Sequence, residues 1–153
     1  MADVHTPEIR SKNMAAIHSA DTRPELIIRR YLHAKGYRYR LHVKKMPGNP
    51  DMVFRKHSAV IFIHGCFWHR HNCQLFQWPK TRVDFWSKKL NQNADRDQRN
   101  TELLSKEWRV GVIWECALRG RGRLDIQDVV SRISDWLSSD IRNVIVTGNA
   151  QLT

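Results

Sequence analysis

The chain carries two thiols and two imidazoles within the eight residues from Cys66 to Cys73, and its third cysteine, Cys116, follows much later. Structural zinc sites take four Cys or His ligands in a tetrahedral arrangement. The set Cys66, His71, Cys73 and Cys116 uses every thiol and would tie an irregular loop to a core strand. Two alternatives stay open: a local site with His69 in place of Cys116, and three unrelated buried cysteines.

A carboxylate and another histidine lie at the ends of two short apolar runs, Asp51–Phe54 and Ala59–His64, which four polar residues separate. This pattern predicts an antiparallel hairpin. If the runs pair directly across that turn, Asp51 lies opposite Phe62, and Asp51 and His64 share one face near one end of the hairpin. A shift of one residue in register would place them on different faces.

A carboxylate beside a histidine can hold Mg²⁺ and help to activate water for attack on a phosphodiester. Glu25, on a preceding helix, could reach a metal-bound water, and His69 could serve as a general acid or base if it is not a zinc ligand. A structural explanation also stays open, in which Asp51 only begins a strand and His64 is a buried histidine with satisfied hydrogen bonds.

These side chains need a scaffold, and its first element is a helix that Asp21 or Thr22 can cap and Gly36 ends. The apolar stripe of this helix is expected at Leu26, Ile27, Tyr31 and Ala34. Residues 1–20 form a basic N-terminal arm with few apolar side chains, so we expect this arm to order on a partner.

The remaining elements predict a mixed α/β fold, in which helices flank a central mixed sheet. We expect a single domain over residues 1–153, without repeats or a linker. Trp108 and Trp114 belong to an apolar strand and are expected in the core. Besides the hairpin, the predicted elements are strands at Tyr37–Val43, Trp108–Trp114 and Asn143–Val146, helices at Thr81–Glu107 and Leu124–Leu137, and an irregular loop at Gly65–Lys80.

The charge balance points to an anionic polymer as partner. Lys and Arg number 26 against 15 acids, which gives a net charge of +11, and such an excess on a small domain favours nucleic acid. The basic residues are spread along the chain rather than held in one helix, and no apolar run is long enough to span a bilayer. We expect a cytoplasmic monomer with no membrane partner, and the odd number of cysteines excludes a disulfide framework.

Several motifs together resemble one family. Pro50-Asp51 and the strand that ends in Phe62-Ile63-His64 resemble a degenerate restriction-endonuclease-like core, in which Phe62 and His64 replace the usual acid and lysine. This departure, and several other runs, resemble the very-short-patch repair (Vsr) endonucleases over about residues 1–122. Those runs are Arg10-Ser11-Lys12-Asn13-Met14, His64-Gly65-Cys66-Phe67-Trp68-His69, Thr81-Arg82 with Phe85-Trp86, and Trp114-Glu115-Cys116-Ala117-Leu118-Arg119-Gly120.

The resemblance implies a Mg²⁺-dependent endonuclease that nicks duplex DNA next to a T:G mismatch arising from deamination of 5-methylcytosine. It implies that Asp51 and the backbone carbonyl of Ile63, a position often occupied by threonine in such enzymes, bind Mg²⁺. His69 would be the general acid or base, with His64 and Glu25 supporting the water network. The implied structural zinc ligands are Cys66, His71, Cys73 and Cys116.

The resemblance also implies contacts with DNA. Three aromatic side chains would wedge into the base stack beside the mismatch: Phe67, Trp68 and Trp86. Met14 would insert from the opposite groove, and its neighbours Lys12 and Asn13 would also contact the DNA. Aromatic side chains on a rigid loop can replace base stacking at a kinked step, where unstacking a mispaired base costs least. The alternative is that Trp68 and Trp86 are core residues, as most tryptophans are.

Two other functions compete with this interpretation. A zinc-containing DNA-binding module without catalysis would explain the charge and the cysteines but gives Asp51, His64 and His69 no role. A zinc nucleobase deaminase needs His-x-Glu and Pro-Cys-x-x-Cys motifs, which the chain lacks. Mismatch-repair proteins and a cognate cytosine methyltransferase system are possible further partners.

Overall fold

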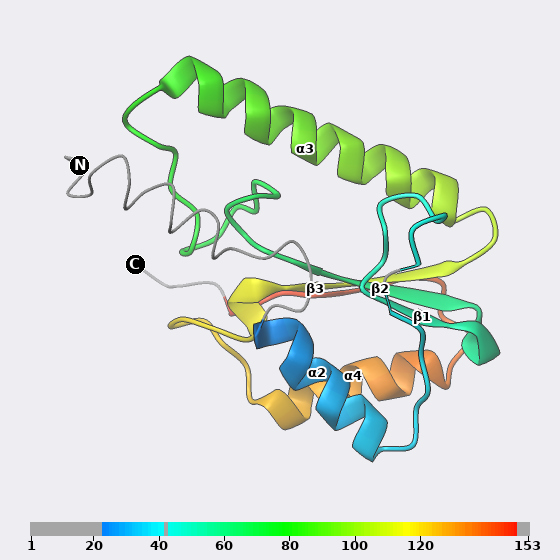
Figure 1. Ribbon diagram of the computed structural model, residues 1–153. Helices are drawn as coiled ribbons and strands as arrows, with labels where there is room; N and C mark the ends of the chain where they lie inside the picture. Colours follow the sequence, from blue (N-terminus) through cyan, green and yellow to red (C-terminus); the bar gives the residue numbers. More distant parts are fainter. Residues whose placement is uncertain (1–22, 42, 150–153) are drawn as a thin grey trace.

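A four-stranded mixed sheet lies between one long helix on one face and two shorter helices on the other (Figure 1). The computed structural model describes residues 23–41 and 43–149. The strand order is β1-β2-β3-β4, with β1 antiparallel to β2 and the other pairs parallel. The elements are α2 (Arg23–Ala34), β1 (Met52–Phe54), η1 (Arg55–His57), β2 (Ala59–His64), α3 (Val83–Leu104), β3 (Arg109–Trp114), η2 (Glu115–Ala117), α4 (Ile126–Leu137) and β4 (Val144–Val146).

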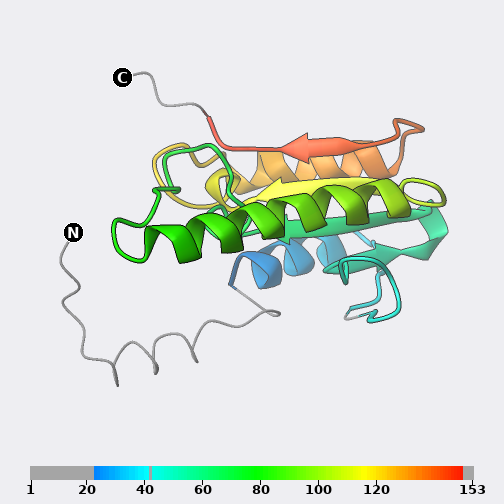
Figure 2. The same cartoon turned by 90° about the horizontal axis from the view of Figure 1, so that it is seen from above.

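This architecture confirms the predicted mixed α/β class. Helix α3 runs along the strands over one face of the sheet (Figure 2), whereas α2 and α4 cover the opposite face. None of the helices in residues 23–41 and 43–149 is both long and apolar enough to cross a bilayer.

The hairpin has the predicted register, with Phe54 paired to Ala59 and Val53 to Val60. The four intervening residues form a 3-10 turn that ends at Ser58, whose backbone is left-handed with φ of 50°. Alternation along β1 and β2 sends Val53, Val60 and Phe62 into a small apolar cluster, which Val110 of β3 and Leu104 of α3 complete. The main core lies on the other side of the sheet, under α2 and α4.

The strand expected over Tyr37–Val43 is wrong as a regular element. The described part of this segment makes one isolated antiparallel bridge, in which Arg40 and Val53 exchange two backbone hydrogen bonds of 2.9 Å. Tyr37 and Tyr39 instead pack against the main core and against Phe54, at ring-centroid distances of 6.4 and 5.5 Å. The alternation of basic and aromatic residues therefore reflects anchoring of a loop by its aromatic side chains.

The expected apolar stripe of α2 is also displaced, because the helix buries a face that includes two charged residues. Its buried side chains are Glu25, Ile28, Arg29 and Leu32. Leu26, which belonged to the expected stripe, is 41% exposed. A search for apolar periodicity alone misses a helical face that buries an ion pair, and here that pair lies at the candidate site.

Arg109, at the start of β3, joins three segments by hydrogen bonds to backbone carbonyls. Its guanidinium donates to His57 of the β1–β2 turn, to Trp136 and Leu137 at the end of α4, and to Ile141 beyond it, at 2.9–3.3 Å. It also lies 4.9 Å from the ring centroid of Trp136. One side chain thus satisfies carbonyls that the end of a helix leaves without partners.

Arg109→Lys should destabilise the fold by about 2–4 kcal/mol, because a single ammonium cannot reach all of these carbonyls and hydrogen bonds to charged groups contribute about 1.5–3 kcal/mol each. Urea denaturation measures this change. Arg132→Lys, at an exposed position of α4, is the matched control and should change stability by less than about 0.5 kcal/mol. Equal stability of the two variants would contradict this role of Arg109.

Candidate active site and metal centre

Asp51 lies where β1 begins, beside the carboxyl end of β2. Its backbone N–H donates to the carbonyl of Ile61 at 2.9 Å, and its carboxylate accepts a hydrogen bond from the Ile63 N–H at 2.5 Å. These bonds hold the carboxylate next to Ile63, which the sequence analysis paired with it in Mg²⁺ binding. The role of the Ile63 carbonyl stays a prediction.

Helix α2 brings a second carboxylate to Asp51. Glu25 is 2% exposed and forms an ion pair of 2.9 Å with Arg29. Burial, and to a smaller extent the nearby Glu25, raise the pKa of Asp51 to about 7, against the opposing effects of the Ile63 N–H and the Arg29 guanidinium. Two buried carboxylates at one place repel each other, and a divalent cation would remove that repulsion, so the donor set fits Mg²⁺.

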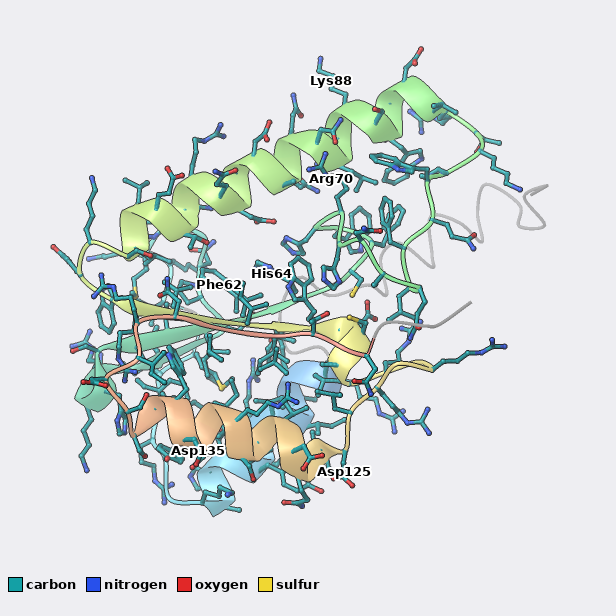
Figure 3. All side chains as sticks on the ribbon, turned by 180° about the vertical axis from the view of Figure 1, so that it is seen from behind. Phe62, His64, Arg70, Lys88, Asp125 and Asp135 are labelled. Atoms are coloured by element: carbon teal, nitrogen blue, oxygen red, sulfur yellow. The ribbon has the colours of Figure 1, made fainter. Side chains whose placement is uncertain are left out.

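Two imidazoles stack at the end of β2, on the face that α3 covers. The rings of His64 and His69 are parallel within 10°, with centroids 3.9 Å apart. Figure 3 shows Phe62 and His64 between the sheet and α3, whereas Asp125, which caps α4, and Asp135 of α4 lie at the opposite side. His64 is 8% exposed, and no described residue pairs with its Nδ1 atom.

Helix α3 supplies the partner of His69. The Nδ1 atom of His69 lies 2.5 Å from the Asp97 carboxylate, so this carboxylate fixes one ring nitrogen and leaves the other to face the site. Burial first, and then the neighbouring His69, lower the pKa of His64 to about 3, so His64 is neutral at physiological pH. His69 differs from His64 in being partly exposed and in having a carboxylate partner, Asp97.

The structure thus divides the predicted catalytic residues into two adjoining groups. Asp51 lies with Glu25 and Ile63, and His64 lies with His69 and Asp97. The register places Asp51 and His64 at the same end of the hairpin, as predicted, but their direct partners differ. Ile63 and His64 are consecutive, so the two groups meet at the end of β2.

The four Cys and His residues of the predicted zinc set come together at the neighbouring edge. The ligand atoms of Cys66, His71, Cys73 and Cys116 all lie within 4.8 Å of one another and could hold a metal ion. His71 Nδ1 is 3.5 Å from the sulfurs of both Cys66 and Cys116. His69, the ligand in the local alternative, instead pairs with Asp97.

The surroundings of these four residues fit a tetrahedral metal centre. Backbone N–H groups of Cys116 and Gly148 donate to the sulfurs of Cys66 and Cys116, each at 3.3 Å, as donors do around metal-bound thiolates. Thr147 Oγ1 lies 3.5 Å from Nε2 of His71, and Nδ1 is the ring nitrogen that faces the sulfurs. Burial raises the pKa of the Cys66 thiol and lowers that of His71, and a bound cation would stabilise the thiolate that burial disfavours.

The aromatic side chains expected to contact DNA form one cluster beside the metal centre. Phe67 lies 5.1 Å from Trp68 and 5.5 Å from Trp86, and the two indoles are 5.9 Å apart, all as ring-centroid distances. All three are partly exposed and belong to neither buried core cluster. Asn93 of α3 donates to the Trp68 carbonyl at 3.0 Å, which holds the tip of the loop against the helix. Met14, Lys12 and Asn13 lie outside the described residues.

Comparison with known proteins identifies the family. Residues 2–75 match the family described as DNA mismatch endonuclease Vsr. The DNA mismatch endonuclease Vsr of Escherichia coli is 43% identical over 141 residues, which cover 92% of this chain and 90% of that protein. This chain belongs to the Vsr family. Two further relatives are type II nicking enzymes, V.XorIIP of Xanthomonas oryzae (48% identical over 82% of this chain and 93% of its own) and V.NmeAIP of Neisseria meningitidis (41% over 88% and 99%).

Sequence reasoning missed two residues of this Vsr-family site, Asp97 and Thr147. Asp97 was one of several polar residues on a long helix, and its position 28 residues beyond His69 carried no local signal. Thr147 follows the last strand and approaches His71 only after β4 pairs with β3. Trp114, expected in the core, is partly exposed and stacks on His71 at 4.0 Å.

Metal analysis should find about one tightly bound metal ion per chain at the four-residue centre. Cys116→Ser should lose both the ion and the fold, because metal binding and folding are coupled. Elemental mass spectrometry and circular dichroism measure the two losses. Thr147→Val keeps all four ligands and should retain the ion but release it to a chelator about tenfold more readily. A folded, metal-bound Cys116→Ser protein would refute the assignment.

Mg²⁺ affinity should depend on pH through Asp51. A carboxyl with a pKa of about 7 is protonated below that pH, so the proton competes with the cation, and the affinity should fall about tenfold per unit as pH drops from 7 to 5. It should level off above about pH 8. Calorimetric titration with Mg²⁺, in two buffers whose ionisation enthalpies differ, measures the protons that the protein releases to the buffer when the cation binds. We expect proton release at pH 6 and little at pH 8.5. Proton release that is unchanged in Asp51→Asn would contradict this origin.

Proposed function

We propose that this chain is a Mg²⁺-dependent DNA endonuclease that nicks duplex DNA beside a T:G mismatch of the kind left by deamination of 5-methylcytosine. Family membership and the named activities of its relatives support a DNA nicking endonuclease. The finer proposal rests on three groups that meet at the end of β2. They are the pair of carboxylates, the stacked histidines with the Asp97 carboxylate, and the cluster of partly exposed aromatic rings.

The carboxylates hold the divalent ion in this proposal. Asp51 and the Ile63 carbonyl would hold Mg²⁺, and Glu25 would support the water network beside it. The ion would supply positive charge to the attacked phosphate and would make a water molecule more acidic. The hydrogen bond from the Ile63 N–H orients the Asp51 carboxylate, and Arg29 holds Glu25 in place.

The histidines move the proton. Asp97 fixes His69 Nδ1, so Nε2 is the atom that accepts a proton from the attacking water or donates one to the leaving oxygen. Neutral His64, stacked on His69, keeps that ring in one orientation without adding a second positive charge. Such proton transfer contributes about 10²–10⁴-fold to the rate.

The Cys/His centre is structural and takes zinc. Four ligands close the coordination sphere, and sulfur with imidazole is the donor set that Zn²⁺ prefers. The centre joins the loop after β2 to the turn after β3, so that Phe67 and Trp68, next to Cys66, are ordered before DNA arrives. Phe67, Trp68 and Trp86 then wedge beside the mispaired base, where unstacking costs least.

The decisive experiment incubates end-labelled duplexes, one with a T:G pair and one fully paired, with and without Mg²⁺. We expect nicking of the T:G duplex alone and only with Mg²⁺. Asp51→Ala and His69→Ala should lower the nicking rate at least about 100-fold. Binding to T:G DNA without Mg²⁺ should stay within about threefold, because these groups act on the reacting phosphate rather than on affinity.

Asp135→Ala, an exposed carboxylate on α4 far from the site (Figure 3), is the matched control and should nick like the unaltered chain. Nicking by Asp51→Ala at the unaltered rate would show that the active site is elsewhere. Preferential binding to T:G DNA without any nicking would favour the alternative, a zinc-containing DNA-binding module without catalysis.

A further inference from the structure

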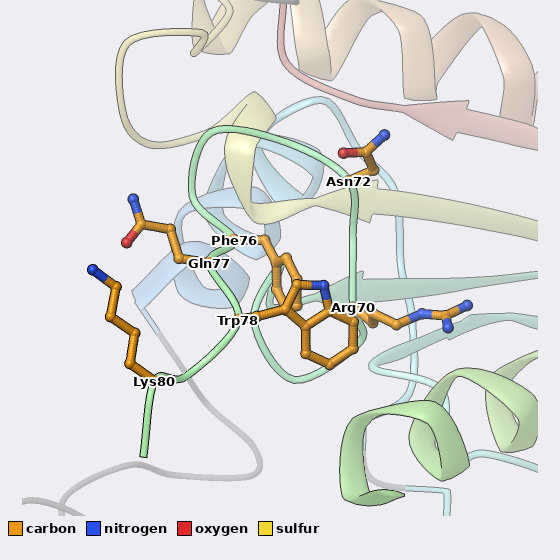
Figure 4. A pocket seen from close by; sticks show the side chains of 6 residues that line it. All are labelled: Arg70, Asn72, Phe76, Gln77, Trp78 and Lys80. Carbon is orange, nitrogen blue, oxygen red and sulfur yellow. The ribbon is translucent and has the colours of Figure 1, made fainter. Parts of the chain in front are cut away.

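The loop between β2 and α3 contains an open pocket that none of the roles above uses. It has a volume of about 700 Å³ and is lined by Arg70, Asn72, Phe76, Gln77, Trp78 and Lys80. Figure 4 shows the aromatic rings at its centre, with Arg70 on one side of the Trp78 indole and Lys80 on the other. Pockets of this size hold small organic ligands in proteins.

The indole of Trp78 offers a face for stacking. Trp78 is 48% exposed and belongs to neither core cluster. Phe76 packs edge-to-face with it, with ring centroids 5.0 Å apart and planes at 83°, so the indole is supported while 48% of the residue stays exposed. An exposed tryptophan supported in this way has the geometry of a stacking platform for a planar group.

The charge of the pocket selects an anionic ligand. Two cations and no carboxylate line it, and neither Arg70 nor Lys80 has an ion-pair partner among the described residues. Arg70 Nη1 donates to the amide oxygen of Asn91 on α3 at 2.6 Å, which orients the guanidinium and leaves its other N–H groups available. The amides of Asn72 and Gln77 add neutral donors and acceptors.

The pocket continues the aromatic cluster that the proposed function assigns to the mismatch. Phe76 lies 6.1 Å from Phe67 and 5.0 Å from Trp78, as centroid distances, so one row of rings leads from the wedge into the pocket. DNA that engages Phe67 and Trp68 would therefore pass over Trp78. A stacking face, a cation and neutral amides match a base and its phosphate, whereas an acidic peptide would leave the indole unused.

We propose that this pocket is a second nucleotide subsite, which receives one nucleotide turned out of the duplex beside the mismatch. Its base stacks on Trp78, its phosphate pairs with Arg70 and Lys80, and Asn72 and Gln77 contact the base edge. The subsite makes the chain sensitive to the sequence that flanks the mismatch. This inference rests on the proposed function and adds a contact that the proposed function does not need.

The test measures binding to the T:G duplex without added Mg²⁺ at one salt concentration. Trp78→Ala should weaken binding about tenfold, because stacking of a base on an aromatic ring contributes about 1–3 kcal/mol. Trp78→Phe keeps a ring and should stay within about threefold. The flanking nucleotides are then replaced by abasic sites, one at a time. At one of these positions, Trp78→Ala and the unaltered chain should bind the abasic duplex with equal affinity, because the base that stacks on Trp78 is already missing.

Two further measurements fix the contacts. The fluorescence of 2-aminopurine at that position should be quenched by the unaltered chain and bright with Trp78→Ala. Arg70→Gln should reduce the slope of log K against log[salt] by about 0.9, the value for one phosphate contact. Arg132→Gln, which removes one exposed charge on α4, should leave the slope unchanged.

The outcomes separate the two proposals. A preference for T:G DNA that survives Trp78→Ala unchanged overturns the subsite while the proposed function stands. The subsite also fails if the loss in Trp78→Ala is the same with every abasic position, because Trp78 then makes no contact with a particular base. Equal binding of the unaltered chain to T:G and paired DNA overturns the proposed function, and the flanking subsite with it.

Discussion

The parallel pairing of β2 with β3 brings the parts of the candidate site to one edge of the sheet. The register places His64 opposite Trp114, so Cys66 and Cys116, each two residues further on, leave the sheet side by side. Parallel strands end at the same edge, and their loops must emerge together there. The metal centre, the histidine stack and the aromatic loop all follow from that shared edge, and a bound metal would in turn hold the two loops at it.

The long helix α3 is the return path that parallel pairing requires, and it also completes the site. A crossover between parallel strands must span the length of the sheet, and this one passes directly over the loop that precedes it. On the way it brings Asp97 to His69, Asn93 to the Trp68 carbonyl and Asn91 to Arg70. A connecting element thereby orients the imidazole proposed for proton transfer, the loop proposed as the wedge and the pocket that adjoins it.

Burial gives the similar groups of the site different tasks. His64 is sealed between strand and helix and stays neutral, whereas His69 is more exposed and is paired with a carboxylate. Asp51 holds its proton more tightly than an ordinary carboxyl because burial and Glu25 both disfavour its charge. The fold therefore maintains an unfavourable cluster of acids that a divalent cation would relieve, which is a common arrangement at functional sites.

The sequence predicted the hairpin and, provided that its two runs pair directly across the turn, the register. It also predicted the helices and, as one of several options, a four-residue Cys/His set, because alternation, turn residues and the scarcity of cysteine are local or compositional signals. It also determined the family, through runs of residues that keep their spacing. Other features appear only in the folded chain: α2 buries Glu25 and Arg29, the described part of Tyr37–Val43 is an anchored loop, Asp97 and Thr147 lie against His69 and His71, and Trp78 lies in a basic pocket. These features depend on contacts between residues far apart in the chain, and such contacts leave no periodic trace in the sequence.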